Sequence, residues 1–259
     1  MFKKTYNSII DLIKDIALLK FNRTKSRGTS SILTESSKDV YANSCAEIAA
    51  RFVDLGFSYA KSMKSMTKRE KNVKYTVSFH SSSYNVKGEY VLLYASAKVQ
   101  STELKDWRKL QKRPYRSDDS VAGGLFHLLT ENLTSSVWRN IAAPETRAGM
   151  LFEIEQDIRE IVLPYFAKFQ NAQTLITQLA TKDLPAFSIG DQVEYALCFS
   201  GSNAAQKIID RFLNERMDLL PAVHEAYTKM KKDGPPPFFF INSVDALALV
   251  SLSYGLKVA

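Results

Sequence analysis

Apolar residues recur with two different periods along this chain. Over residues 1–21 they return at helical spacing, which predicts an amphipathic helix that packs on its own protein, on a second copy, or on a membrane surface or partner groove. Residues 22–40 are rich in Ser, Thr and charge and predict a linker. A second helix is predicted from Ser44, which forms a capping-box pattern with Glu47, to Gly56, which can adopt the positive φ that closes a helix.

The period changes to two after this helix, which is typical of β-strands. If the two long strands each send one set of alternate side chains to the core, antiparallel pairing places Phe79 opposite Val91 and Tyr75 opposite Ala95. Strands are predicted at residues 57–61, 63–69, 73–80 and 89–100.

The same pairing gathers polar and aromatic side chains on the other face of the two long strands. Aromatic and basic groups on one sheet face are typical of proteins that stack bases while neutralising phosphates. A helix that covers this face is a simpler explanation of its Tyr and Leu side chains. The pairs expected on this face are His80 with Tyr90, Thr76 with Tyr94, and Lys74 with Ser96.

The helical period returns from Thr146 and continues to Pro164, which is expected to kink or end the helix. Strands early and helices late favour an α+β fold, with an antiparallel sheet packed with helices and followed by a helical C-terminal region. The expected parts are an amphipathic helix and linker at 1–40, an α+β domain at 41–180 and a helical region packed on it at 181–259. Shorter helices are predicted at residues 171–180, 191–199, 203–213, 218–230 and 243–254.

Positive charge is concentrated in the first half of the chain. The net charge is +8, and residues 1–120 hold 23 Lys and Arg against 12 Asp and Glu. This asymmetry predicts either a contact with an anionic partner such as nucleic acid or an ordinary solvated surface. The basic segment 101–120 is likewise either a nucleic-acid contact or a charged helix with one buried Trp. The candidate nucleic-acid-binding residues are Lys74, Lys98, Lys105, Trp107, Arg108, Lys112 and Arg113.

Catalytic and cofactor motifs are absent from the sequence. Cys45 and Cys198 match no metal-ligand spacing and the three histidines are dispersed, so neither a metal site nor a cofactor is predicted. Cys45 falls on an apolar stripe and is expected to be a packed core thiol. Glu103 and Lys105 imitate one half of a metal-dependent nuclease site, but the preceding strand offers no second carboxylate for Mg²⁺.

The order of several segments resembles an uncharacterised bacterial family, the domain of unknown function numbered 4304. The resemblance covers roughly residues 42–180 and implies an α+β fold in a bacterial cytoplasmic protein. It implies no activity for this chain, because the family has no established function. It rests on Leu55–Phe57, Phe79–Asn85, the strand after Gly88, Trp138, Leu163–Phe166 and Phe169.

These observations predict a non-catalytic bacterial interaction protein. Toxin, immunity and phage-defence systems are the settings considered for it. A nucleic-acid-binding protein is the alternative, and a metal-dependent nuclease is a third reading. Charges interrupt the apolar residues of the N-terminal segment, so no signal peptide or transmembrane segment is predicted there. The expected setting is the cytoplasm, with an unknown protein partner, a possible nucleic acid, and homo-oligomers through the N-terminal helix as a further possibility.

Overall fold

An antiparallel sheet of six strands runs through the computed structural model, which describes residues 35–112, 114–131, 138–234 and 242–258. Five strands lie in the order β1-β2-β3-β4-β5, and β6 pairs with β4. Residues 35–259 form one compact unit. The helix predicted at residues 1–21 lies outside the described residues. The strands are β1 (Ser58–Ala60), β2 (Ser65–Glu70), β3 (Val73–Ser81), β4 (Leu92–Ser101), β5 (Ser120–Leu125) and β6 (Arg139–Asn140).

The register of the two long strands differs from the predicted one by four residues. Phe79 lies opposite Ala95 instead of Val91, and Tyr75 lies opposite Val99. The connection between β3 and β4 is longer than expected because Val86 bridges to Tyr90 inside it, which delays the start of β4. A shift by an even number of residues leaves every side chain on its predicted face, so the assignment of faces holds.

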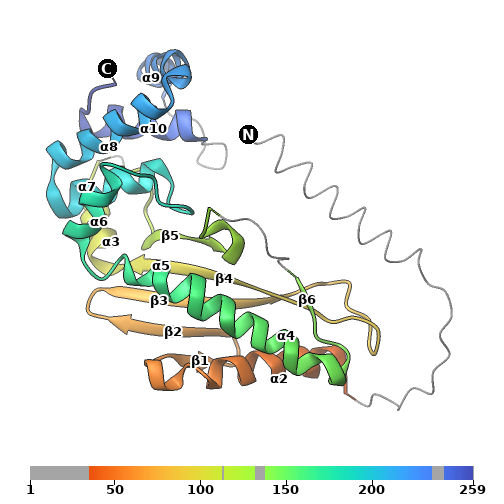
Figure 1. The fold of residues 1–259 in the computed structure, drawn as a ribbon. Coiled ribbons are helices and arrows are strands. Elements are labelled where there is room, and N and C mark those ends of the chain that lie inside the picture. The colour runs from red at the N-terminus through yellow and green to blue at the C-terminus, as the bar shows by residue number, and fades with distance from the viewer. Residues whose placement is uncertain (1–34, 113, 132–137, 235–241, 259) are drawn as a thin grey trace. The chain divides into compact units, whose positions relative to one another are not determined.

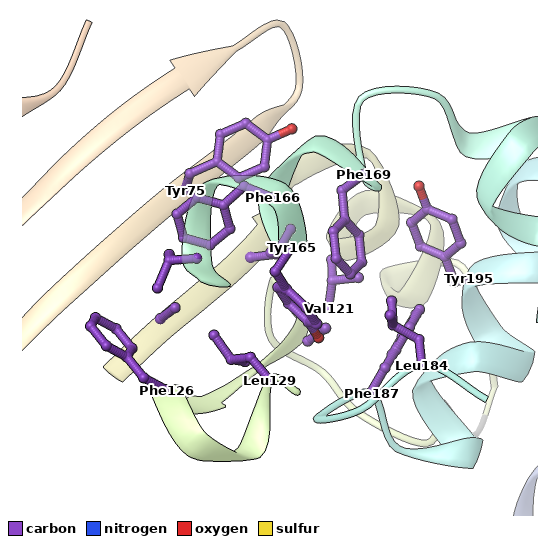
Figure 2. Packing of buried hydrophobic residues seen from close by; sticks show 14 of the residues in the cluster. Tyr75, Val121, Phe126, Leu129, Tyr165, Phe166, Phe169, Leu184, Phe187 and Tyr195 are labelled. Atoms are coloured by element: carbon purple, nitrogen blue, oxygen red, sulfur yellow. The ribbon is translucent and has the colours of Figure 1, made fainter. Parts of the chain in front are cut away.

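Helices cover the inner face of the sheet, as the α+β prediction requires. The first, α2 (Ser37–Ala50), packs against β1 and β2, and α4 (Pro144–Asp157) packs against α2. A π-helical turn, η3 (Ile158–Val162), joins α4 to the short α5 (Leu163–Ala167), where Phe166 lies 4.9 Å from Tyr75 between ring centroids. Figure 2 shows this aromatic packing. The chain therefore remains helical through Pro164, which the sequence pattern treated as a kink or an end.

The remaining helices gather at the β5 end of the sheet (Figure 1). The contact with the sheet is made by α7, which packs on β5 and on α3, and α8 and α10 pack on α7 in turn. Their buried residues join those of the sheet in one hydrophobic cluster. The helices are α3 (Thr102–Lys109), α6 (Ala172–Leu179), α7 (Ile189–Ser200), α8 (Ser202–Glu215), α9 (Leu220–Asp233) and α10 (Ser243–Tyr254).

The boundaries of α2 correct the predicted capping box. The helix begins at Ser37, about two turns before Ser44, and the side chain of Ser36 caps it by accepting a hydrogen bond from the Asp39 amide at 3.1 Å. Ser44 is buried within the helix. At the other end, α2 passes into a single 3-10 turn that closes at Gly56 with φ 85°, as the glycine predicted. Cys45 is fully buried, and burial raises its pKa to about 12.

Candidate functional site

The outer face of the sheet carries the residues that the sequence placed opposite the core. Along β4 the inner positions are buried and the outer positions are half-buried in strict alternation. The sheet therefore has one packed face and one partly open face, which is common for antiparallel sheets. A helix that covers the outer face would bury these positions, and their remaining exposure argues against that explanation.

Aromatic rings occupy one end of this outer face. His80 lies opposite Tyr94, and their rings stack with centroids 4.7 Å apart and planes 21° apart. The ring of Trp138, next to β6, lies 4.1 Å from that of Tyr94. All three side chains are half-buried. They form a small, partly exposed aromatic surface at this end of the open face.

Burial lowers the pKa of His80 below its usual value, and a 2.8 Å hydrogen bond joins its Nε2 to the hydroxyl of Ser96. His80 is therefore neutral at pH 7 and adds no positive charge to the surface. Because its pKa is lower in the folded chain than in the unfolded chain, its contribution to stability is present above pH 6.5 and is lost as the pH falls.

Replacing His80 by Gln is expected to flatten the fall in the free energy of unfolding between about pH 7 and pH 5, because a glutamine cannot take up the proton. Urea titrations at several pH values measure this slope. Part of it is expected to remain, since burial also lowers the pKa of His127. An unchanged slope in the His80→Gln protein would contradict the assignment.

Cations occupy the other end of the outer face. Arg69 on β2 lies opposite Lys74 on β3, and Lys98 on β4 lies opposite Thr76. Arg69 is exposed and the two lysines are half-buried. Thr67 and Thr76 share the row of Lys98, and the next row, toward the aromatic end, holds the hydroxyls of Ser65, Ser78 and Ser96.

Two acidic residues, Asp118 and Asp119, lie beside the β5 edge of these rows. Asp119 accepts a hydrogen bond of 2.8 Å from the amide of Gln100. Against the effect of burial, the hydrogen bond and charge of Arg116, with a smaller contribution from the charge of Lys98, lower the pKa of Asp118. Among the cross-strand positions of β2, β3 and β4 that share the outer face, all of them described, there is no carboxylate. The open face is therefore polar and positive with an aromatic end.

The structure divides the predicted nucleic-acid-binding residues into separate groups. Lys74 and Lys98 share the outer face of the sheet, where they lie in adjacent rows of cross-strand pairs. On α3 and after it, Lys105 is half-buried, Lys112 is exposed, and the ring of Trp107 packs 5.6 Å from that of Tyr254. Arg113 lies outside the described residues.

Arg108 is the clearest departure from the predicted surface, because it is fully buried. Its Nε donates to Glu194 at 2.7 Å and its Nη2 donates to Asp191 at 2.8 Å. Its Nη1 donates to the carbonyl oxygens of Ser120 and Asp118 at 2.6 and 3.1 Å. Arg108 therefore joins α3, β5 and α7 inside the protein and is not available to a phosphate.

In the structure, Glu103 and Lys105 do not have the arrangement that the nuclease hypothesis requires. Both residues lie on α3, where a separation of two residues turns side chains about 200° apart, so they do not converge. Within the described residues there is no group of three or more His, Cys, Asp or Glu side chains that could hold a metal ion. Glu103 instead lies at a pocket on the inner side of the sheet.

These features define an α+β protein whose sheet leaves one face open. Comparison with known protein families, with curated proteins and with solved structures finds no match for this chain. The resemblance to the bacterial family thus stays a prediction from the residues that carry it. In the described part of the chain, no helix is long and apolar enough to span a membrane.

Proposed function

We propose that this protein is a non-catalytic binding protein whose open sheet face binds single-stranded nucleic acid. The observation that carries the proposal is the placement of the His80, Tyr94 and Trp138 rings and the Arg69, Lys74 and Lys98 cations on one partly open face. Stacked bases need aromatic faces, and phosphates need cations within reach.

The spacing of the two groups favours an extended strand over a single nucleotide. Tyr94 and Lys98 lie four residues apart on β4, which corresponds to roughly 13 Å along the strand. A ligand must therefore be several bonds longer than one base to use both ends. Because bases in a duplex are stacked on one another, only a single strand offers free base faces to Tyr94.

Salt dependence gives the first test. Binding of labelled oligo-dT and oligo-U to the parent protein is expected to weaken steeply between about 50 and 200 mM salt. In the Lys74→Gln/Lys98→Gln protein, the slope of log K against log salt is expected to be shallower by about 1.4, since each lost phosphate contact on a single strand removes about 0.7. Fluorescence anisotropy measures both slopes.

A matched control changes the same charge elsewhere. Lys231 and Lys232 are exposed in the last turn of α9, and replacing both by Gln is expected to leave the slope close to that of the parent. An equal loss in both double variants would show that binding depends on net charge alone. That result, or no retention of either oligonucleotide at low salt, would overturn the proposal.

Stacking gives an independent test. Tyr94→Leu is expected to weaken single-strand binding by about 1–3 kcal/mol while leaving the salt slope unchanged, because it removes a ring and no charge. Duplex DNA of the same sequence serves as the comparison and is expected to bind more weakly than the single strand.

The cellular setting belongs to the proposal as well. Cys45 and Cys198 are both free thiols, which supports a reducing compartment such as the cytoplasm. A bacterial toxin, immunity or phage-defence system and a protein partner are further parts of the hypothesis that rest on the sequence. If oligonucleotides fail to bind, a protein partner becomes the favoured occupant of the open face.

A further inference from the structure

A pocket of about 370 Å³ lies on the inner side of the sheet, away from the open face. Its size falls at the lower end of the range for small-molecule sites. It forms where the β2–β3 turn meets α7 and the segment after α5, and α3 contributes Glu103 to its lining. It does not share residues with the proposed nucleic-acid surface, so the two can be tested separately.

Four aromatic rings line the pocket. Tyr195 and Phe199 project from successive turns of α7 with ring centroids 4.6 Å apart, and Phe169 meets Tyr195 edge-on at 6.4 Å. Tyr75 comes from β3. In Figure 2 the hydroxyl of Tyr75 points toward the side on which Phe169 and Tyr195 lie. The rings make the lining apolar, and their faces, unlike their edges, carry the negative electrostatic character that attracts a cation.

The hydroxyl of Tyr75 has no hydrogen-bond partner among the described residues. Its side chain is only 2% exposed. Burial, followed by the charge of Glu70, raises its pKa to about 12, so the hydroxyl keeps its proton. A buried hydroxyl left without a partner costs free energy, and a ligand in the pocket could accept or donate the missing bond.

Two carboxylates lie at the pocket and differ in their partners. Glu70 forms an ion pair of 2.6 Å with Lys68 and accepts a hydrogen bond of 3.3 Å from Gln170. Glu103 accepts a hydrogen bond of 3.2 Å from the amide of Asn72, and within the described residues it makes no ion pair. Glu103 therefore brings a negative charge without a matching cation to the aromatic lining.

We propose that this pocket binds a small organic ammonium cation. The aromatic rings attract the positive charge through their faces, Glu103 neutralises it, and the buried Tyr75 hydroxyl meets the polar part of the ligand. Clusters of aromatic rings are a recurrent solution for quaternary ammonium ligands. Lys71 also lines the pocket and opposes a cation, but it is exposed and its long stem can turn into solvent.

Calorimetry with choline and with putrescine tests the proposal on the full chain. At least one of them is expected to bind with a dissociation constant in the millimolar range or below. The uncharged carbon analogue of choline, in which a tert-butyl group replaces the trimethylammonium group, is expected to bind at least about fivefold more weakly. Equal binding of charged and uncharged analogues, or no binding of either cation, would overturn it.

Charge variants test the site by the sign of the effect. Glu103→Gln is expected to weaken cation binding roughly threefold to fivefold, and Lys71→Gln is expected to strengthen it. Glu145→Gln is the matched control, because Glu145 is also an exposed glutamate in the first turn of a helix, α4, and does not line the pocket. Equal effects of Glu103→Gln and Glu145→Gln would contradict the assigned site.

A ring variant separates cation–π binding from charge alone. Phe199→Leu keeps the half-buried position apolar and is expected to weaken choline binding about fivefold, with circular dichroism confirming the fold. Tighter binding of a lysine-containing peptide than of either free cation would also overturn the proposal, since it would assign the pocket to a protein partner.

Discussion

Replacing Arg108 by Met is expected to lower the free energy of unfolding by about 3–5 kcal/mol, because it leaves the buried Glu194 without its counter-charge and removes the nearer of the two cations that pair with Asp191. Glu194 is fully buried and Asp191 is nearly so. The second oxygen of Glu194 accepts hydrogen bonds from the Tyr254 hydroxyl at 2.6 Å and from the Tyr115 amide. The loss therefore reaches α3, α7 and α10 at once. Urea unfolding followed by circular dichroism measures it.

Arg159 provides the control for this substitution. It also forms an ion pair, with Glu155 at 2.8 Å, but its side chain is 39% exposed and Glu155 has a second partner in Arg51. Arg159→Met is therefore expected to cost no more than about 1 kcal/mol. Similar losses in the two variants would show that the buried ion pairs of Arg108 contribute no more than an exposed one.

A combined variant distinguishes the charge from the volume. If the cost of Arg108→Met arises from unpaired carboxylates, adding Asp191→Asn and Glu194→Gln should recover part of the lost stability, since neutral amides are cheaper to bury. The three sites share one hydrogen-bond network, so their effects are not expected to add. A combined variant less stable than Arg108→Met alone would rule out this explanation.

The sequence assigned Arg108 to the surface because it stands among lysines and arginines. Its buried carboxylate partners, Asp191 and Glu194, lie more than 80 residues away in the chain, where no local pattern reveals them. One local signal was available. Arg108 follows Leu104 by four residues and so shares the buried face of α3 with it. A charged residue on an apolar helical stripe indicates a buried ion pair.

The period of two in the sequence predicted the long strands and their faces, and the structure confirms both. It did not predict the register, which depends on side-chain hydrogen bonds inside the connection. The side chain of Asn85 accepts a bond from the Leu92 amide at 2.9 Å and donates one to Ser81 at 2.6 Å. These bonds and the Val86–Tyr90 bridge lie in the connection just before β4, among residues that show no periodicity.

The fifth strand could not be recognised from its composition. Its sequence contains Gly123 and Gly124, and glycine is depleted in strands because it loses the most entropy on folding and has no side chain to pack. The aromatic pocket could not be predicted from the sequence either, because Tyr75 and Tyr195 lie 120 positions apart and come together only in the folded chain. In its local sequence, each aromatic residue of the lining has the pattern of an ordinary core residue.

Gly123 is expected to be nearly irreplaceable for a reason that the sequence does not show. Its φ of 142° lies in a region that L residues rarely adopt. A Cβ built on it would lie 2.2 Å from the carbonyl oxygen of Ala97 and 2.8 Å from the Cα of Lys98. Both atoms belong to the backbone of β4, so no side chain can rotate away to make room.

Gly123→Ala is therefore expected to lower the free energy of unfolding by about 3 kcal/mol or more, combining backbone strain with overpacking. Gly149→Ala supplies a control of opposite sign. Gly149 lies within α4 and has no atom within 4 Å of a built Cβ, so the same change should stabilise the protein by about 0.5–1 kcal/mol. Urea unfolding of both variants measures the difference. A Gly123→Ala protein as stable as the parent would mean that β5 does not lie this close to β4. Because Lys98 lies opposite Gly123, the position of Lys98 on the open face would then be wrong as well.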